Sequence, residues 1–340
     1  MIPQLRDEAR IVSGDDIAAL IADVQRQAAQ RGVDPSAGIF GPDSISWKIN
    51  RESALFLGAG RAALLQLAHP WVAAALEQHS SLMAKPIARF HNTFRIVFTM
   101  IFGSLDQASR SARHLHSLHT QIQGAVPEDI AAYARGSHYQ ANQIAALRWV
   151  YATLVESAVL AYECVRPPLT VAERAAYYAE SRTLAALFGL PASDLPESWE
   201  AFIAYCRAME NSSALGVSAG ARQMAHNLLA GAGSWIKPPH WYRSLTTLWL
   251  PPRFRAEFQL SYQAAESQAA ARARQRLPRI YRSLPASVRF IGPWREANAR
   301  IRNRTPGPIT RISNRFWLGQ PLLTFRTDTA PRPVRPAANP

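Results

Sequence analysis

Residues 54–76 read ALFLGAGRAALLQLAHPWVAAAL, and this stretch sets the expectation for the fold. It is apolar with helical patterning, and His69–Pro70 interrupts it, since a proline inside such a pattern ends or kinks a helix. A second apolar stretch, LRWVYATLVESAVLAYECV, covers residues 147–165. Arg61 in the first and Glu156 in the second leave neither with the roughly 18 charge-free residues of a transmembrane helix, so none is predicted.

The rest of the chain also favours helices. No run of alternating β-branched residues and no βαβ rhythm stands out, so an all-α fold is predicted: a single large multi-helix domain. We expect helices at 15–31, through most of 47–102, and at 104–123, 127–136, 138–161, 170–190, 198–209, 217–229 and 252–273. Residues 1–40 form an N-terminal helix and linker, 41–288 the domain, and 289–340 an irregular, partly disordered tail rich in Arg and Pro.

Composition limits the possible classes of protein. Cys164 and Cys206 are the only cysteines, which excludes a disulfide framework or a zinc ribbon and fits a cytoplasmic setting. The net charge of +14 is concentrated at one end: residues 272–340 carry 15 Arg against two acids, a net of +13. A basic segment of this kind binds nucleic acid or anionic membranes in other proteins, but it contains no known reader motif.

Six of the nine histidines fall between positions 69 and 119, and the densest group lies in RHLHSLHTQIQG, residues 113–124. His116 and His119 are three residues apart and share a helix face, whereas His114 lies nearly opposite both. Neutral imidazole is the commonest protein ligand for iron, zinc and copper. This helix therefore offers one or two inward-facing metal ligands, and its pattern does not choose between His116 and His119.

Two other clusters carry polar groups on helical faces. In KPIARFHNTFR, residues 85–95, Arg89 and Thr93 are four apart with Asn92 between them, a combination suited to an anion or an oxygen species. Arg61 and His69 are eight apart, which also predicts one shared face. A buried Arg61 needs a carboxylate partner, either a protein side chain or a haem propionate.

Carboxylates are scarce where the histidines cluster. Glu77 and Asp106 are the only acids in residues 53–125, and the sequence contains no HExxH, paired ExxH or GxSxG motif. This argues against an acid-rich metal site such as a di-iron centre. Iron held by imidazole in a helical pocket points to haem.

Four blocks of the sequence together carry a family resemblance: GRAALLQLAHPWVAAALEQHS (60–80), PIARFHNTFR (86–95), HSLHTQIQG (116–124) and LRWVYATL (147–154). Over about residues 40–285 the chain resembles the family of the rubber oxygenase (latex-clearing protein) and the MpaB-type ER-bound oxygenase catalytic domain, found mostly in bacteria. The resemblance implies an all-α fold around haem b.

The resemblance also implies roles for individual residues. His119 matches the proximal iron ligand, and Arg89 and Thr93 match polar residues on the distal side. Asn92 stands where rubber oxygenase has a lysine, and His116 stands where it has an arginine. Trp149 and Tyr151 are candidates for the pocket wall or plain core aromatics.

The function that the resemblance implies is O₂-dependent cleavage of a carbon–carbon double bond in an apolar, isoprenoid or lipid-like substrate. Two other functions stay open: a haem protein of this fold with a peroxidase-like, sensing or non-catalytic role, and a non-enzymatic protein whose Arg-rich tail binds nucleic acid or anionic membrane. A peripheral membrane contact is compatible with each. The sequence does not predict the oligomeric state.

Overall fold

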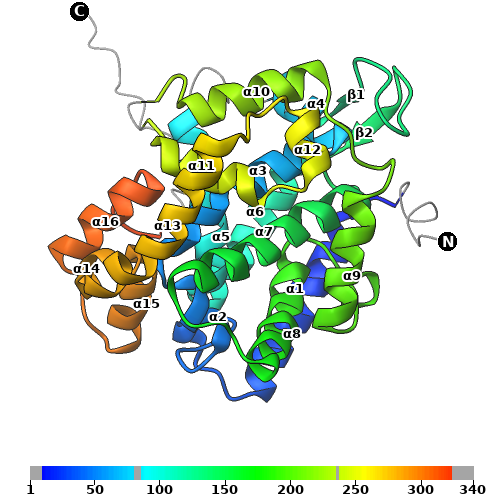
Figure 1. The fold of residues 1–340 in the computed structure, drawn as a ribbon. Coiled ribbons are helices and arrows are strands. Elements are labelled where there is room, and N and C mark those ends of the chain that lie inside the picture. The colour runs from blue at the N-terminus through cyan, green and yellow to red at the C-terminus, as the bar shows by residue number, and fades with distance from the viewer. Residues whose placement is uncertain (1–9, 80–85, 235–236, 324–340) are drawn as a thin grey trace, which may run out of the picture.

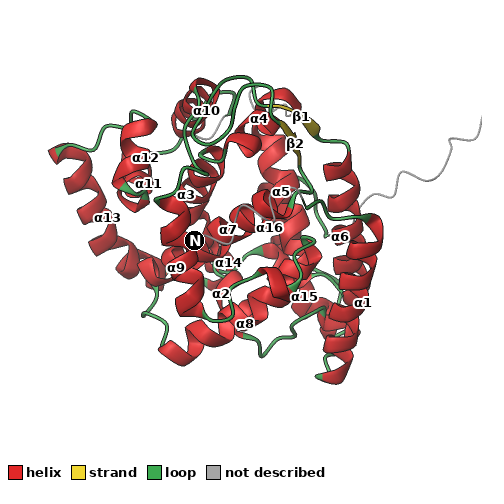
Figure 2. Cartoon of the chain, turned by 90° about the vertical axis from the view of Figure 1, so that its right-hand side faces the viewer, coloured by secondary structure: helices red, strands yellow, loops and turns green. Residues whose placement is uncertain are grey.

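The structure is a computed structural model that describes residues 10–79, 86–234 and 237–323 (Figure 1). In these ranges the chain forms sixteen α-helices and one pair of short strands, so the predicted all-α class is confirmed. The helices are α1 Gly14–Gln30, α2 Ile45–Asn50, α3 Phe56–Leu67, α4 Pro70–His79, α5 Pro86–Phe102, α6 Leu105–Thr120, α7 Ile144–Val165, α8 Val171–Leu187, α9 Trp199–Glu210, α10 Ala219–Ala230, α11 His240–Trp249, α12 Pro252–Glu257, α13 Ala264–Ser283, α14 Ala286–Arg289, α15 Gly292–Ile301 and α16 Pro308–Leu318. The strands β1 Gln123–Ala125 and β2 His138–Gln140 pair antiparallel at the edge of the helical body (Figure 2).

Helix α7 runs through the middle of the molecule and packs against α3, α8, α9 and α13 (Figure 1). Among the described residues it is the one helix long and apolar enough to cross a membrane. However, 67% of its apolar window is buried inside the fold, as expected for the core helix of a folded domain. Helix α7 therefore supplies the core against which the other helices pack.

Glycines in GAG allow α3 to approach its neighbours closely. A Cβ atom added at Gly58 would lie 2.5 Å from the backbone oxygen of Ser157 on α7, and one added at Gly60 would lie 2.8 Å from the Oγ1 of Thr246 on α11. Both positions need a residue without a side chain, because interiors are close-packed and backbone cannot yield easily. The Gly58–Ala59–Gly60 segment therefore serves close helix packing.

Arg61 is 2% exposed and lies at the junction of four helices. Its Nη2 donates to Glu156 Oε2 on α7 at 2.6 Å and to Glu210 Oε1 on α9 at 3.4 Å. Its Nη1 donates to Ser157 Oγ, and its Nε donates to the Trp249 carbonyl of α11. The sequence left open whether the carboxylate partner of Arg61 is a protein side chain or a haem propionate. In the structure the partners are the protein side chains of Glu156 and Glu210.

Several helix boundaries differ from those predicted. The break at His69–Pro70 is confirmed, since α3 ends at Leu67 and α4 begins at Pro70. The helix predicted at 127–136 is wrong: this segment is a loop between β1 and β2, where the Asp129 side chain accepts from the backbone N–H of Arg135. The helix predicted at 252–273 divides into α12 and α13, because Glu257, the last residue of α12, is bound by residues outside the helix. Its side chain accepts the backbone N–H of Val217, just before α10, and its carbonyl accepts from the Arg222 side chain of α10.

The irregular tail predicted from residue 289 is also wrong for the described part. Residues 292–301 and 308–318 form α15 and α16, which pack on each other and on α5. Pro293 and Pro308 stand in the first turn of these helices, where proline is compatible with helical geometry. Gly319 ends α16 with a left-handed φ of 72°. Residues 324–340 of the predicted tail lie outside the described residues.

Replacement of Gly58 tests the close α3–α7 contact. Gly58→Ala is expected to lower the free energy of unfolding, because overpacking against backbone costs about 1–3 kcal/mol and exceeds the gain of at most about 1 kcal/mol in helix propensity. Gly14→Ala is the matched control, since nothing lies within 4 Å of its added Cβ. Urea unfolding measures both; an equally stable Gly58→Ala variant would contradict the close approach.

Removal of Arg61 tests the buried charge network. Arg61→Met is expected to cost about 3–5 kcal/mol, since it leaves buried carboxylates uncompensated. Burial and the Glu156 charge already raise the pKa of Glu210, and the loss of Arg61 raises it further. The folded variant then holds a proton that the unfolded chain releases, so its stability falls as pH rises through the range between the two pKa values.

The loss caused by Arg61→Met is therefore expected to be larger at about pH 8 than at about pH 5. Urea unfolding at both pH values, with the exposed Arg113→Met as control, measures this difference. A loss that is equal at the two pH values would show that Glu210 does not take up the proton.

Candidate functional site

Helices α5 and α6 form an antiparallel hairpin that positions the candidate site. Only Gly103 and Ser104 separate them, and the Ser104 hydroxyl accepts the backbone N–H of Gln107 to begin α6. Arg89 lies fourteen residues before Gly103 and His119 sixteen residues after it. Because each helical residue advances the chain by the same rise, the two side chains lie at similar levels, near the open end of the hairpin.

His119 is half-buried near the end of α6, on the face that also carries the buried Ala108 and Ala112. Burial lowers the pKa of His119 to about 4, and the nearby charge of Arg89 lowers it in the same direction. A hydrogen bond with the Asn142 side chain acts in the opposite sense. The imidazole is therefore neutral at neutral pH, which is the form that ligates metals.

The two other histidines of α6 have different surroundings. His116 Nε2 lies 3.0 Å from the backbone oxygen of Val12, so its ring connects α6 to the segment before α1. His114 is exposed, as its position on the helix predicted. Asn142, just before α7, donates to the carbonyl of His116 and to the Thr120 hydroxyl. Sequence reasoning missed Asn142, because no local pattern relates it to α6.

Arg89, Asn92 and Thr93 all lie on α5, as predicted. Arg89 is half-buried, and burial lowers its pKa. Asn92 and Thr93 are exposed, and the Asn92 side chain accepts a hydrogen bond from Arg95 one turn later.

A narrow, largely apolar cavity lies further along α5. Val97 and Ile101 continue the row that begins with Arg89 and Thr93, since each is four residues beyond the last, and both line this cavity. The remaining wall comes from α2, α7 and α8 and from the residue that follows α8: Ser46, Asn50, Tyr151, Leu154, Val155, Ala158, Tyr177, Ser181, Leu184 and Phe188. Helix α5 thus carries a cation toward its beginning and lines an apolar space further along.

Tyr151 and Trp149, the two aromatic residues considered for the pocket wall, lie in different parts of the structure. Tyr151 lines the apolar cavity, and its hydroxyl lies 2.8 Å from Ser181 Oγ. Trp149 is 1% exposed, and its indole donates to the Leu65 carbonyl at 2.7 Å. Trp149 therefore has the position of a core aromatic that connects α7 to α3.

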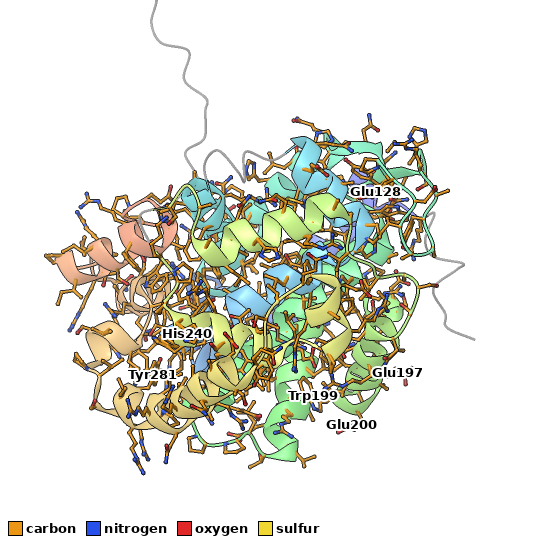
Figure 3. The ribbon with its side chains drawn as sticks, turned by 45° about the horizontal axis from the view of Figure 1, so that its top comes forward. Glu128, Glu197, Trp199, Glu200, His240 and Tyr281 are labelled. Carbon is orange, nitrogen blue, oxygen red and sulfur yellow. The ribbon has the colours of Figure 1, made fainter. Side chains whose placement is uncertain are left out.

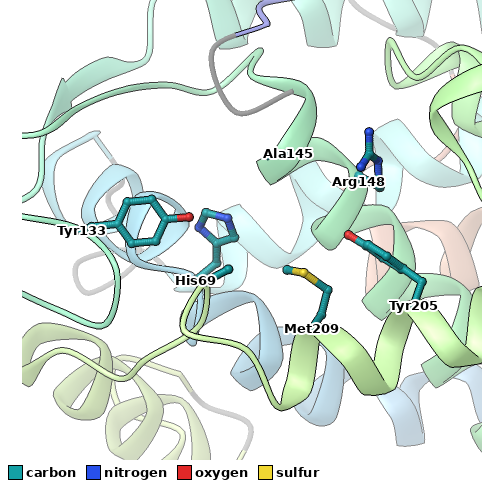
Figure 4. Close-up of a pocket in the computed structure, with 7 residues that line it drawn as sticks. His69, Tyr133, Ala145, Arg148, Tyr205 and Met209 are labelled. Carbon is teal, nitrogen blue, oxygen red and sulfur yellow. The ribbon is translucent and has the colours of Figure 1, made fainter. Parts of the chain in front are cut away.

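His69 lies in a different part of the core. Because α3 ends at Leu67, the face predicted to join Arg61 and His69 does not extend to the histidine. His69 is 1% exposed, its Nδ1 has no hydrogen-bond partner, and burial lowers its pKa to about 4. With Tyr133, Arg148 and Tyr205 it lines a small cavity whose wall is completed by apolar side chains (Figure 4).

The residues at the end of the hairpin suit a cofactor that carries its own metal ligands. Within the described residues no three His, Cys, Asp or Glu side chains are grouped to hold a metal ion. Porphyrin supplies four nitrogen ligands, and an imidazole is one of the protein groups that hold haem iron. His119 fits that role, and the nearby Arg89 fits an anionic propionate or oxygen species.

Comparison with known proteins gives one match. The family described as "ER-bound oxygenase mpaB/B'/Rubber oxygenase, catalytic domain" matches residues 47–289. Neither the curated proteins nor the solved structures contain a match to this chain. The matched range includes α3 to α13, and thus both the α5–α6 hairpin and the Arg61 network. The chain therefore belongs to the family of MpaB-type and rubber oxygenase catalytic domains.

Proposed function

We propose that this protein is a haem b-dependent oxygenase that cleaves a carbon–carbon double bond of an apolar, isoprenoid or lipid-like substrate with O₂. The family supports an oxygenase that acts on a small molecule. The observation that carries the finer proposal is the juxtaposition of His119 and Arg89 at the end of the α5–α6 hairpin. The apolar cavity beyond Thr93 and Val97 supports the class of substrate.

Each residue of the hairpin has a distinct task in this proposal. His119 would hold the haem iron through its neutral imidazole, and the neighbouring Asn142 side chain would orient the ring, as outer partners of metal-bound imidazoles commonly do. Haem supplies the iron centre at which O₂ is activated. Arg89 donates hydrogen bonds to negative charge that develops on oxygen, and its partial burial strengthens that interaction.

The remaining groups position the reactants. Thr93 lies one turn beyond Arg89 and orients oxygen or a water molecule with its hydroxyl. The aliphatic wall of the cavity, including Leu154 and Leu184, holds the alkene and excludes water. The alkene and O₂ give two carbonyl products, one oxygen atom in each, so the reaction balances without an external reductant.

Absorption spectra of the purified protein titrated with haem test the axial ligand. The wild type is expected to develop a Soret band, and His119→Ala to abolish or shift it, because the iron loses its protein ligand. His114→Ala is the matched control from the same helix and is expected to keep the wild-type band. If no band forms in the wild type, or if His114→Ala removes it, the assignment of His119 is wrong.

Replacement of Arg89 separates cofactor binding from chemistry. Arg89→Ala is expected to retain the Soret band but to reduce O₂ uptake with a polyisoprene substrate by roughly 10²-fold, since one preorganised donor is lost. Arg89→Lys should recover part of the rate, and the exposed Arg113→Ala should leave it unchanged. Full activity of Arg89→Ala would exclude the proposed role.

A further inference from the structure

Helix α16 exposes an apolar stripe. Ile309, Ile312 and Phe316 are 60%, 63% and 44% exposed and lie three and four residues apart, so they share one face. The opposite face, with Asn314 and Leu318, is buried against the body. Isolated exposed apolar side chains are common on protein surfaces, but three on one short helix face form a continuous patch.

The contacts of α16 hold this stripe in place. Trp317 stacks on Phe56 with ring centroids 3.5 Å apart, and His91 Nε2 of α5 lies 2.9 Å from the Phe316 carbonyl oxygen. The Asn314 amide donates to Glu296 of α15 at 2.7 Å. The helix is therefore docked firmly on α5 and α15, with the stripe directed away from both.

Helices α13 to α16 carry a large excess of positive charge, and Arg311 and Arg315 lie on α16 itself. Residues 272–323 include twelve arginines, and their one acid, Glu296, is buried and accepts from Asn314 and from the backbone N–H of Leu323. Figure 1 shows α13, α14, α15 and α16 on the same side of the molecule, and around Tyr281 side chains ending in nitrogen project outward in Figure 3. The exposed arginines are Arg272, Arg274, Arg276, Arg279, Arg282, Arg302, Arg304, Arg311 and Arg315.

We propose that this face docks on the surface of an anionic lipid bilayer. Apolar side chains on one helix face bury in the headgroup–acyl boundary, and flanking arginines bind lipid phosphates. Nucleic acid would use the charge but has no use for the exposed Ile309, Ile312 and Phe316. Helix α16 lies outside the matched range 47–289, so its apolar stripe is a feature of this chain beside the matched domain.

Docking has a consequence for the rest of the molecule. Helix α5 packs against α16 and carries Arg89 and Thr93 toward its beginning. A bilayer bound to the stripe is therefore separated by α16 from the helix that forms one side of the candidate site. This arrangement suits a substrate that dissolves in the apolar phase.

Vesicle flotation with the full chain tests the proposal. At about 50 mM salt we expect strong binding to vesicles of phosphatidylcholine with phosphatidylglycerol and weak binding to phosphatidylcholine alone, because the charge term needs anionic lipid. Ile312→Ser and Phe316→Ser are each expected to reduce partitioning roughly fivefold to tenfold, given the apolar area that they remove. Val171→Ser is the matched control, because Val171 is an exposed apolar side chain on α8, 75% exposed, that does not belong to the stripe.

The charge contribution is measured separately. Arg311→Gln/Arg315→Gln is expected to weaken binding to anionic vesicles roughly 30-fold. The control Arg26→Gln/Arg110→Gln, which removes exposed arginines paired within their own helices, should have little effect. Circular dichroism confirms that each variant folds.

Three results would overturn the docking surface. The first is a failure of the protein to bind anionic vesicles at low salt, and the second is partitioning of both Ile312→Ser and Phe316→Ser equal to that of the wild type. The third is binding to double-stranded DNA in preference to vesicles. None of these readouts depends on haem or on catalysis, so they leave the proposed oxygenase function untouched.

Discussion

The buried ion network of Arg61 with Glu156 and Glu210 constrains the arrangement of the helical body. Hydrophobic contact between helices such as α3 and α7 is not directional, so burial of apolar surface alone does not select one arrangement. A guanidinium inside that contact has to meet its carboxylates, Ser157 and the Trp249 carbonyl at once. One relative placement of α3, α7, α9 and α11 satisfies this requirement, and Gly58 provides the close approach that it needs.

The α5–α6 hairpin connects this body to the candidate site. Its short turn brings Arg89 level with His119, although thirty residues separate them in sequence. Helix α5 carries Arg89 toward its beginning, lines the apolar cavity further along, and also packs against α16. A single helix therefore joins the candidate cofactor site, the apolar space and the basic outer face, which explains why the PIARFHNTFR block is so informative.

The errors in the sequence prediction share a physical cause. The loop at 127–136 looked helical because its composition allows it, yet β1 pairs with β2 and accepts hydrogen bonds from α4, with Gln78 donating to the Ala125 carbonyl. Residues 292–318 looked irregular because they are rich in Arg and Pro. Pro293 and Pro308 in fact begin helices, and stacking of Trp317 on Phe56 stabilises the second one. In each case contacts distant in sequence outweighed local preference.

The sequence by itself determined the all-α class, the break at His69–Pro70, the opposite orientations of His114 and His119, and the membership of the family, because helical periodicity and motif spacing are local properties. Only the tertiary structure decided that Arg61 pairs with protein carboxylates, that His116 contacts Val12, and that Arg89 comes near enough to His119 for its charge to lower the pKa of the histidine. It also decided which side of α16 stays exposed. These depend on which helices meet, and that is set by packing of the whole core rather than by any one segment.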